Sequence, residues 1–457
     1  MNTNTHYTLF IAIFLGVFFL AGCSVHTVNV SPEPMVSADE FYSVAAPELP
    51  YNDENWWAVF GDSKLDGFIL NGLENNYNVL QAVARLAQAS ALTLQARADR
   101  APQIGLAAES EQTWREDGES EDFSRIGAAF SWEVDVFNRL ESIASARQSE
   151  QSARRDDVEA VRLRLSAEIA EAYFDAVGWR NQLALLEKQI VIDTDLLELT
   201  QLRFESGLTA SVDMLQQSSQ LADTESLVPA VEAALRVSEN RLDVLMGYPP
   251  DGQDRVTDED AFVDIKELPF IGVPADLLIR RPDLRALRNE LVAADMEIGR
   301  AIAERLPQIT LDGSFFYEDN LLPSGVAASL IGAFVQPLID WGKRKAEVER
   351  NRALYVEELA KFTQRYLEAI EDVENALYQE RKQREFLERL AKRLRFLEKT
   401  VEETTERYTN GLTDYLPVLD AVKEFERLQR VIIQQERALL GFRIQLYRAL
   451  GGSLPPR

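Results

Sequence analysis

Residues 343–410 read KRKAEVERNRALYVEELAKFTQRYLEAIEDVENALYQERKQREFLERLAKRLRFLEKTVEETTERYTN, a run of 68 residues without glycine or proline, flanked by Gly342 and Gly411. Its apolar residues recur at spacings of three and four, which predicts one amphipathic helix packed against other helices at a coiled-coil period. At about 1.5 Å per residue this helix would be about 100 Å long. The clearest part of the apolar stripe is Leu387, Leu390, Leu394, Leu397 and Val401. In an isolated segment this pattern would be typical of a dimeric coiled coil.

A second copy of the pattern argues against that interpretation. Arg139 to Ser206 is again 68 residues long, and only Gly178 interrupts it. The two stretches end in the same phrase, RFESGLT at 203–209 and RYTNGLT at 407–413, at an offset of 204 residues. The sequence therefore predicts two copies of one unit of about 200 residues.

Each repeat is predicted to run as a leading helix, a β-hairpin, a long helix and a return helix. The hairpins are expected at 103–132 and 309–337, where apolar residues alternate with others. The stretch 66–100 is expected to be helical, with the leading helices at 79–100 and 284–306 and the return helices at 214–246 and 418–450. We expect each leading helix and return helix to lie end to end beside a long helix. The hairpins would then lie about 100 Å from the turns at Gly207 and Gly411.

The full predicted organisation is a signal peptide at 1–22, a lipid-anchored strap at 23–62, a first repeat at 63–248, a linker or equatorial segment at 249–281, a second repeat at 282–452 and a tail at 453–457. Within the strap, the aromatic segment 56–62 is expected to dock on the helices.

The amino-terminal segment predicts lipidation. Leu9 to Leu20 is a 12-residue apolar run, the length of a signal-peptide core. Leu20-Ala21-Gly22-Cys23 then follows the small-residue pattern of a bacterial lipobox, and Ser24 is typical of sorting to the outer membrane. Cys23 is the only cysteine, so the covalent lipid is the one attached group expected, without disulfides. The alternative is an ordinary signal peptide.

Composition argues against several functional classes. The net charge of −27 opposes binding to nucleic acid. Only His26 remains after signal removal, which leaves little scope for histidine catalysis or metal ligation. No nucleotide-binding, serine-hydrolase or zinc-protease motif appears. We therefore expect neither an enzyme nor a metal site.

The hairpins point to a membrane. Four strands from one chain cannot close a barrel, and open sheet edges are not tolerated in lipid, so several chains would have to pool their strands. Aromatic residues suited to a lipid interface flank the strands: Trp114, Trp132, Phe315, Tyr317 and Trp341. The alternative is ordinary packing in a soluble sheet.

Taken together, the sequence resembles the outer-membrane factors of tripartite efflux systems, of the TolC/OprM type and closest to the NodT-like lipoprotein branch. The matching residues are Leu20-Ala21-Gly22-Cys23, Trp56-Trp57 through Phe60-Gly61-Asp62, Pro274-Ala275-Asp276-Leu277-Leu278 through Arg281-Pro282-Asp283-Leu284-Arg285, and Tyr408 through Gly411 to Leu419-Asp420-Ala421. The resemblance covers essentially the whole mature chain. It implies a mostly α fold with a small membrane β-sheet, assembled as a homotrimer with a trimeric α-helical barrel and a 12-stranded β-barrel. It also implies a periplasmic adaptor and an inner-membrane pump, of the RND type, as partners.

The resemblance further implies a periplasmic gate at the turns of the helices. Asp420 corresponds to the family's innermost aspartate, whereas a second family aspartate is replaced by Pro417. From spacing alone, Asp420 is a solvated turn acid. Three carboxylates meeting on one axis would repel one another and attract cations.

A second part of the implied gate joins the two repeats. Asp213 matches a position that bonds a second-repeat tyrosine, here Tyr408. The family's nearby arginine is replaced by Thr413, and Asp414 is a substitute acid. From spacing alone, Asp213 is a helix cap. The sequence predicts that Asp420→Ala with Tyr408→Phe makes the channel leakier.

The predicted function is a passive trans-periplasmic conduit that exports small toxic compounds. The alternatives in the same class are an exit duct for type I protein secretion or for metal cations. A structural or adaptor coiled-coil lipoprotein of the periplasm is the alternative from a different class.

Overall fold

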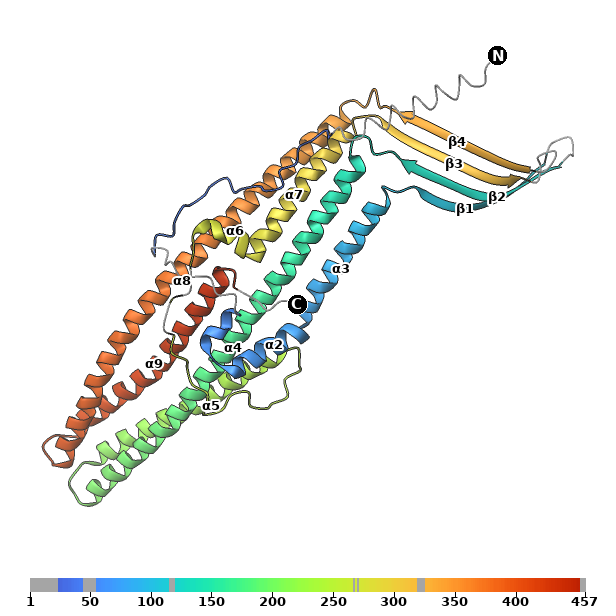
Figure 1. Ribbon diagram of the computed structural model, residues 1–457. Helices are drawn as coiled ribbons and strands as arrows, with labels where there is room; N and C mark the ends of the chain where they lie inside the picture. The colour runs from blue at the N-terminus through green and yellow to red at the C-terminus, as the bar shows by residue number, and fades with distance from the viewer. Residues whose placement is uncertain are drawn as a thin grey trace, which may run out of the picture. The chain divides into compact units, whose positions relative to one another are not determined.

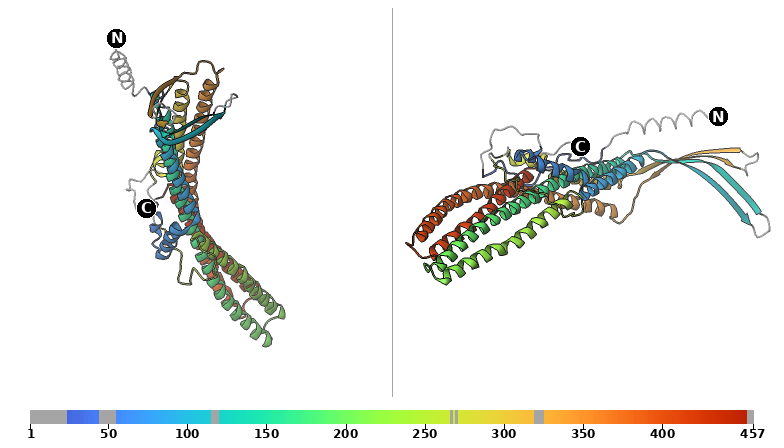
Figure 2. Two further views of the ribbon diagram at one scale, coloured as in Figure 1. Left: turned by 90° about the vertical axis from the view of Figure 1, so that its right-hand side faces the viewer. Right: turned by 90° about the horizontal axis from the view of Figure 1, so that it is seen from below.

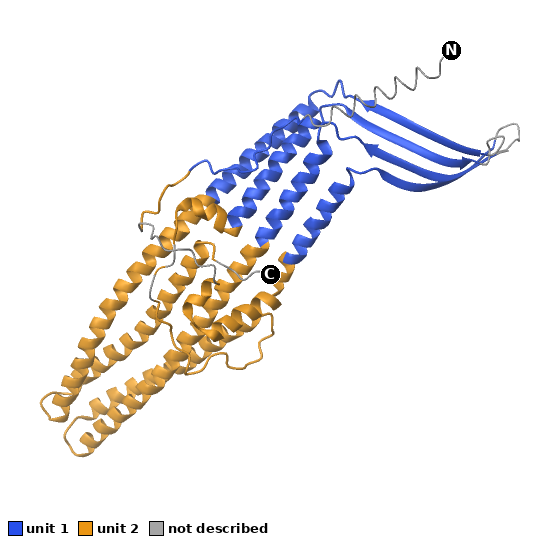
Figure 3. Ribbon diagram, viewed as in Figure 1, with its two compact units in different colours: residues 1–36, 83–157, 283–365 blue, residues 37–82, 158–282, 366–457 orange. Residues whose placement is uncertain are grey.

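The structure is a computed structural model that describes residues 24–43, 55–114, 120–265, 268, 271–318 and 325–452. The predicted signal peptide, the lipidation site Cys23, most of both hairpin tips and the tail lie outside the described residues. The chain forms two compact units (Figure 3). Unit 1 comprises residues 1–36, 83–157 and 283–365, and unit 2 comprises 37–82, 158–282 and 366–457.

The described chain is mostly helical, and the order of its elements repeats (Figure 1). The predicted long helices are confirmed as α4 (Arg139–Glu205) and α8 (Lys343–Thr409), each of 67 residues. The return helices are α5 (Ser211–Leu245) and α9 (Leu416–Ala449). The other elements are η1 (Trp56–Phe60), α2 (Ser63–Asn75), α3 (Tyr77–Ala98), β1 (Gln103–Trp114), β2 (Ser120–Glu133), η2 (Pro274–Asp276), α6 (Leu277–Arg280), α7 (Pro282–Ala303), β3 (Gln308–Glu318) and β4 (Gly325–Val335). Among the described residues, no helix has an apolar stretch long enough to cross a bilayer.

The leading helix predicted over 79–100 is confirmed as α3, but the helical stretch predicted over 66–100 is not continuous, because the chain breaks at Asn76 into α2 and α3. Asn76 is extended (φ −68°, ψ 130°). Its Nδ2 donates to the carbonyl of Leu245 at 2.8 Å, and its Oδ1 accepts from the backbone N–H of Asn78 at 2.8 Å. One side chain thus satisfies the end of α5 and the start of α3, which offsets the break.

Each return helix ends beside the start of a leading helix within unit 2. Arg281 directly precedes α7 and donates to the carbonyl of Ala449 at 3.1 Å, as Asn76 does to Leu245. Gly247 and Gly451 follow the two return helices with φ of 88° and 94°. A Cβ on Gly247 would lie 2.6 Å from the carbonyl oxygen of Asn75, so only glycine fits this approach. These junctions place the helix ends together, as expected from their lengths.

The four strands of unit 1 form one antiparallel sheet in the order β1-β2-β3-β4 (Figures 1 and 2). The two hairpins pair through β2 and β3, where Ala128 lies opposite Phe315. The outer strands β1 and β4 each have only one neighbour in this sheet. The sheet therefore has two free edges in the single chain.

The N-terminal strap is held along both units in turn. In unit 1, the His26 ring Nε2 lies 2.7 Å from Asp295 Oδ1, and the backbone N–H of Asn29 donates to Asp295 Oδ2 at 2.7 Å. In unit 2, the backbone N–H of Tyr42 donates to Glu374 at 2.6 Å. These bonds hold residues 24–43, over which the structure describes neither a helix nor a strand.

The predicted aromatic plug docks within unit 2. Trp56, Trp57 and Phe60 are buried, and the Trp56 indole N–H donates to Ser166 at 2.9 Å. The Tyr173 hydroxyl donates to Asp62 at 2.6 Å. The segment 56–62 is thus part of the core of this unit.

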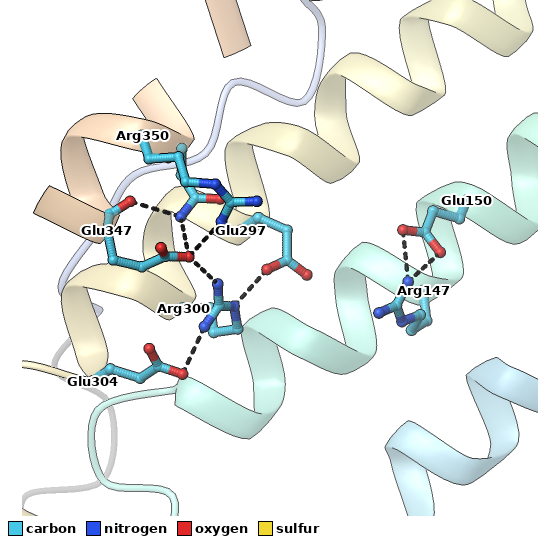
Figure 4. A network of polar contacts seen from close by, with 8 residues as sticks. Arg147, Glu150, Glu297, Arg300, Glu304, Glu347 and Arg350 are labelled. Carbon is cyan, nitrogen blue, oxygen red and sulfur yellow. Dashed lines mark hydrogen bonds and ion pairs between the residues drawn. The ribbon is translucent and has the colours of Figure 1, made fainter. Parts of the chain in front are cut away.

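An ion-pair network ties helices of unit 1 together beside the sheet (Figure 4). Arg300 of α7 lies 2.5 Å from Glu297, 2.6 Å from Glu304 and 3.4 Å from Glu347 of α8. Burial disfavours the guanidinium charge, but the bonds to Glu297 and Glu304 outweigh it and raise the pKa of Arg300. Within α8, Arg350 also pairs with Glu347 at 2.8 Å.

Candidate functional site: the sheet face and the helical turns

One face of the sheet is mainly apolar, and its described polar residues lie toward the tip of the β1–β2 hairpin (Ser110, Gln112, Asp122 and Ser124). Because side chains alternate along a strand, the register assigns each residue to a face. The first face carries Ile104, Leu106, Ala108 and Trp114 of β1, Ile126, Ala128, Phe130 and Trp132 of β2, Ile309, Leu311, Phe315 and Tyr317 of β3, and Val326, Ala328, Leu330 and Phe334 of β4. Asp122, near the hairpin tip, is the only charged residue on this face of the described strands. Leu106 is 90% exposed and Leu330 is 68% exposed.

The opposite face carries the charged groups. Among the side chains that the structure describes, these are Glu109, Glu111, Arg125, Glu133, Asp312 and Glu318. Arg125 donates to Glu109 at 2.7 Å and lies 4.8 Å above the Phe316 ring. The sheet thus separates an apolar surface from a polar one.

Four of the five predicted interface aromatics lie on the apolar face. Trp114 and Tyr317 lie toward the hairpin tips, Phe315 lies between them and the base, and Trp132 lies at the base. The Trp132 indole N–H donates to the Arg100 carbonyl at 2.9 Å. Trp341 lies outside the strands, 96% exposed, with a left-handed φ of 53° that is unusual for a bulky residue. Both ends of the apolar face therefore carry an amphipathic aromatic ring.

The turns of the two helical hairpins lie in unit 2 and have the same geometry. Gly207 and Gly411 adopt φ of 72° and 70°. The backbone N–H of Leu208 donates to the Arg203 carbonyl, and that of Leu412 to the Arg407 carbonyl, each at 2.8 Å. These are Schellman caps, which require a left-handed residue and explain the shared GLT phrase.

The predicted bond between Asp213 and Tyr408 is not formed. The Asp213 carboxylate instead accepts from the Thr209 hydroxyl of its own turn. Tyr408 is buried, and its hydroxyl has no hydrogen-bond partner in the described chain. Its ring instead lies 4.5 Å below the Arg203 guanidinium, which also donates to the Thr409 carbonyl at 3.1 Å. A cation–π contact thus joins the two turns where a hydrogen bond was predicted.

The other predicted gate residues are at the surface of the single chain. Asp420 and Asp414 are exposed, and Thr413 is half-buried. Asp420 lies in the first turns of α9, beside the buried residues Val418 and Leu419. Its side chain is therefore available to a neighbouring surface.

Sequence reasoning missed Tyr415, which makes a buried hydrogen bond between the repeats. Tyr415 is fully buried, packs edge-on against Tyr408 at 5.2 Å, and donates its hydroxyl proton to Gln217 Oε1 of α5. Burial and the charge of Asp193 raise the Tyr415 pKa, so the hydroxyl stays protonated. The first repeat has Ser211 at the equivalent position. This difference between the repeats is the sequence signal that could have identified Tyr415.

A buried polar network continues from Gln217 along α5. Gln217 Nε2 donates to the Asp193 carbonyl of α4 at 2.8 Å, and the Thr224 hydroxyl donates to Asp193 Oδ2 at 2.7 Å. Gln220 Nε2 donates to Glu426 Oε2 of α9 at 3.1 Å. Gln217, Gln220 and Thr224 are spaced by three and four along α5. Polar residues thus occupy the core-facing positions at which an amphipathic helix usually carries apolar residues.

The network links both helical hairpins through directional bonds. Gln189 of α4 donates to Gln429 of α9 at 2.9 Å and accepts from Arg430 at 2.5 Å. Buried polar groups of this kind hold a specific arrangement of helices and are costly to leave unpaired. No group of three potential metal ligands occurs in the part of the chain that the structure describes.

Comparisons with known proteins agree with these features. A sequence model of the outer membrane efflux protein family matches residues 69–248 and 273–452. Nodulation protein T of Rhizobium leguminosarum bv. trifolii is 26% identical over 427 residues, 90% of each chain. The pyoverdine export outer membrane protein OpmQ of Pseudomonas putida is 28% identical over 427 residues, 89% of each chain.

The fold also matches solved structures. The outer-membrane channel OprN superposes with a TM-score of 0.85 at 25% identity, covering 94% of this chain and 99% of OprN. Since the family model matches both repeats and so most of the chain, the protein belongs to the outer membrane efflux protein family and is an efflux channel of the outer membrane.

Proposed function

We propose that three copies of this chain assemble into one passive conduit across the outer membrane and periplasm. Three four-stranded sheets would supply twelve strands for a closed β-barrel, and the helices would form a helical barrel beneath it. A periplasmic adaptor and an inner-membrane pump, of the RND type, recruit the conduit and supply the energy.

The observation that carries this proposal is the one-sided sheet with two open edges. A closed barrel in lipid needs an apolar exterior, a polar interior and no free edge. The register provides the first two within one chain. Pairing β4 of one copy with β1 of the next would remove the edges. The strands of 11 to 14 residues are long enough to cross a bilayer when tilted.

Asp420 is proposed to line the periplasmic opening, one carboxylate per copy. Its exposure in the single chain leaves it free to face the axis. The bonds of Tyr415 and Arg203 across the repeats would hold this opening closed until an adaptor displaces them. Cross-repeat bonds worth about 1–3 kcal/mol in total per copy are small enough for a binding partner to overcome.

The proposed cargo is a class of small toxic compounds. The name of OpmQ records pyoverdine export, which supports a small-molecule cargo. Export of proteins or of metal cations remains the competing use of the same architecture.

The test is membrane fractionation, crosslinking and a susceptibility panel, with wild type compared with Cys23→Ala. Wild type should fractionate with the outer membrane, crosslink as a trimer and lower susceptibility to several small toxic compounds. The Cys23→Ala chain should lose lipid labelling. Protection against metal salts alone, or secretion of a protein substrate alone, would favour the competing cargoes. A soluble monomer without a change in susceptibility would favour a structural lipoprotein.

A further inference from the structure

The buried network contains two carboxyl groups but too few donors. Asp193 is fully buried and Glu426 is 2% exposed, on helices packed into the same interior. Asp193 accepts from Gln217 and Thr224. Glu426 Oε2 accepts from Gln220 Nε2 at 3.1 Å, whereas Glu426 Oε1 is buried without a partner in the described chain.

The second unpaired atom is the acceptor of the same amide. Gln220 is 3% exposed, and its Oε1 is also buried without a partner in the described residues. Two buried acceptors on bonded side chains lack one donor between them. A carboxylic acid and an amide can form two complementary hydrogen bonds, since the amide N–H donates to one acid oxygen and the acid O–H donates to the amide oxygen. One proton on Glu426 supplies the missing donor.

We propose that Glu426 binds a proton and, as the neutral acid, donates to Gln220 Oε1, so that the packing of α9 against α5 depends on this one proton. The site is a proton-binding site inside the helical bundle, outside the predicted turn residues. The expected effect on helix packing does not depend on whether the protein transports anything. An effect on conduction would rest on the proposed function.

The surrounding charges favour the neutral acid. Burial, followed by the charge of Asp193 on α4, raises the pKa of Glu426 to about 8, although Arg430 and the Gln220 bond oppose this shift. Arg430 is itself half-buried, and burial lowers its pKa. Asp223 of α5 and Arg427 of α9 act on Arg430 from either side, and Tyr415 remains neutral. Among the described residues, the Arg430 guanidinium donates to Gln189 and not to Glu426 Oε1.

The sign of the pH effect follows from linkage. When the helices separate, the pKa of Glu426 returns to its ordinary value of 4.5, and the group loses the proton at neutral pH. Separation therefore releases a proton between pH 4.5 and about pH 8. The opening equilibrium should rise about tenfold per pH unit in this window and level off above it.

The test uses the full-length lipidated protein as assembled in detergent. Hydrogen-exchange protection of residues 217–224 and 422–430, corrected for intrinsic exchange, should fall with pH and level off near pH 8. Glu426→Gln, which mimics the neutral acid, should abolish this slope. The control is Glu424→Gln on the same helix, since bonding to Arg427 lowers the pKa of half-buried Glu424, which therefore carries no proton change in this window.

Infrared spectroscopy gives a second, independent readout. Wild type at neutral pH should show a protonated-carboxyl band that Glu426→Gln lacks and Glu424→Gln retains. A wild-type protection profile without the slope, a slope that survives in Glu426→Gln, or an unchanged carboxyl band would each overturn the proposal. If the variant fails to fold, the wild-type slope and its band near neutral pH still decide. Neither readout measures transport, so failure here leaves the proposed conduit standing.

Discussion

Tyr408 and Tyr415 are stacked neighbours with different energetic roles. Both rings are buried, but only the Tyr415 hydroxyl is bonded, to Gln217. The Tyr408 hydroxyl has no partner within the described chain. The contribution of a buried tyrosine hydroxyl to stability therefore depends on whether it has a hydrogen-bond acceptor.

This contrast gives a matched pair of substitutions. Tyr415→Phe should lower the free energy of unfolding by about 1–3 kcal/mol, because it leaves Gln217 Oε1 buried without its donor. Tyr408→Phe should be neutral or slightly stabilising, because it removes an unpaired buried hydroxyl. Thermal denaturation of both variants checks this. Single-channel conductance should rise in Tyr415→Phe and stay at the wild-type level in Tyr408→Phe. A larger loss of stability in Tyr408→Phe would contradict the assignment.

At this scale the sequence was a limited guide. The turn glycines and the GLT phrase could be predicted, because they depend on local backbone geometry. The role of Asp420 stays a prediction. The predicted partner of Tyr408 was wrong: the Asp213 carboxylate accepts from Thr209 of its own turn, and the Tyr408 ring lies against Arg203. Glu426 stood among 75 acidic residues, and only its burial separates it from the solvated ones.

At the scale of elements, the long helices were predictable to within a residue of their ends. Each is bounded by residues that require or tolerate positive φ, such as Asn138 and Gly411. The break at Asn76 was not, because asparagine is tolerated inside helices and its bond to Leu245 joins segments far apart in sequence.

The turns between the long and return helices should be sensitive to loss of glycine. Gly411→Ala should lower the melting temperature by a few degrees, corresponding to about 1 kcal/mol, because alanine is strained at φ 70°. The matched control is Gly67→Ala, inside α2, exposed and with nothing within 4 Å of the added Cβ. It should be neutral or stabilising by up to about 1 kcal/mol. Equal losses in both variants would argue against the left-handed requirement.

At the scale of the whole molecule, the division of the sheet into two faces is stronger evidence for a membrane-facing surface than the aromatic residues alone. Alternation predicted two hairpins, but a sequence does not state how two hairpins pair. The β2–β3 register is what brings sixteen apolar residues onto one surface. Assembly as a trimer stays a prediction, as does the distance from the sheet to the turns.

Adjacent residues of β1 test the assignment of faces. Leu106→Arg should place a charge in lipid at a cost of about 2–4 kcal/mol per copy near the midplane, and so reduce membrane insertion. Ala107→Arg, one residue along and on the polar face, should insert normally. The yield of heat-modifiable protein from outer membranes measures both. Equal yields would mean that the two faces do not differ in their exposure to lipid.

The open edges of the sheet have a consequence for biogenesis. Before membrane insertion, a newly exported subunit would expose the apolar face of its sheet to water. The two free edges would also expose backbone groups without hydrogen-bond partners. The subunit would therefore tend to aggregate with other copies until the subunits assemble. Escort by holdase chaperones, or rapid mutual docking beside the insertion machinery, is therefore a requirement of this architecture, and cells short of such escorts should accumulate the protein as insoluble, protease-sensitive material.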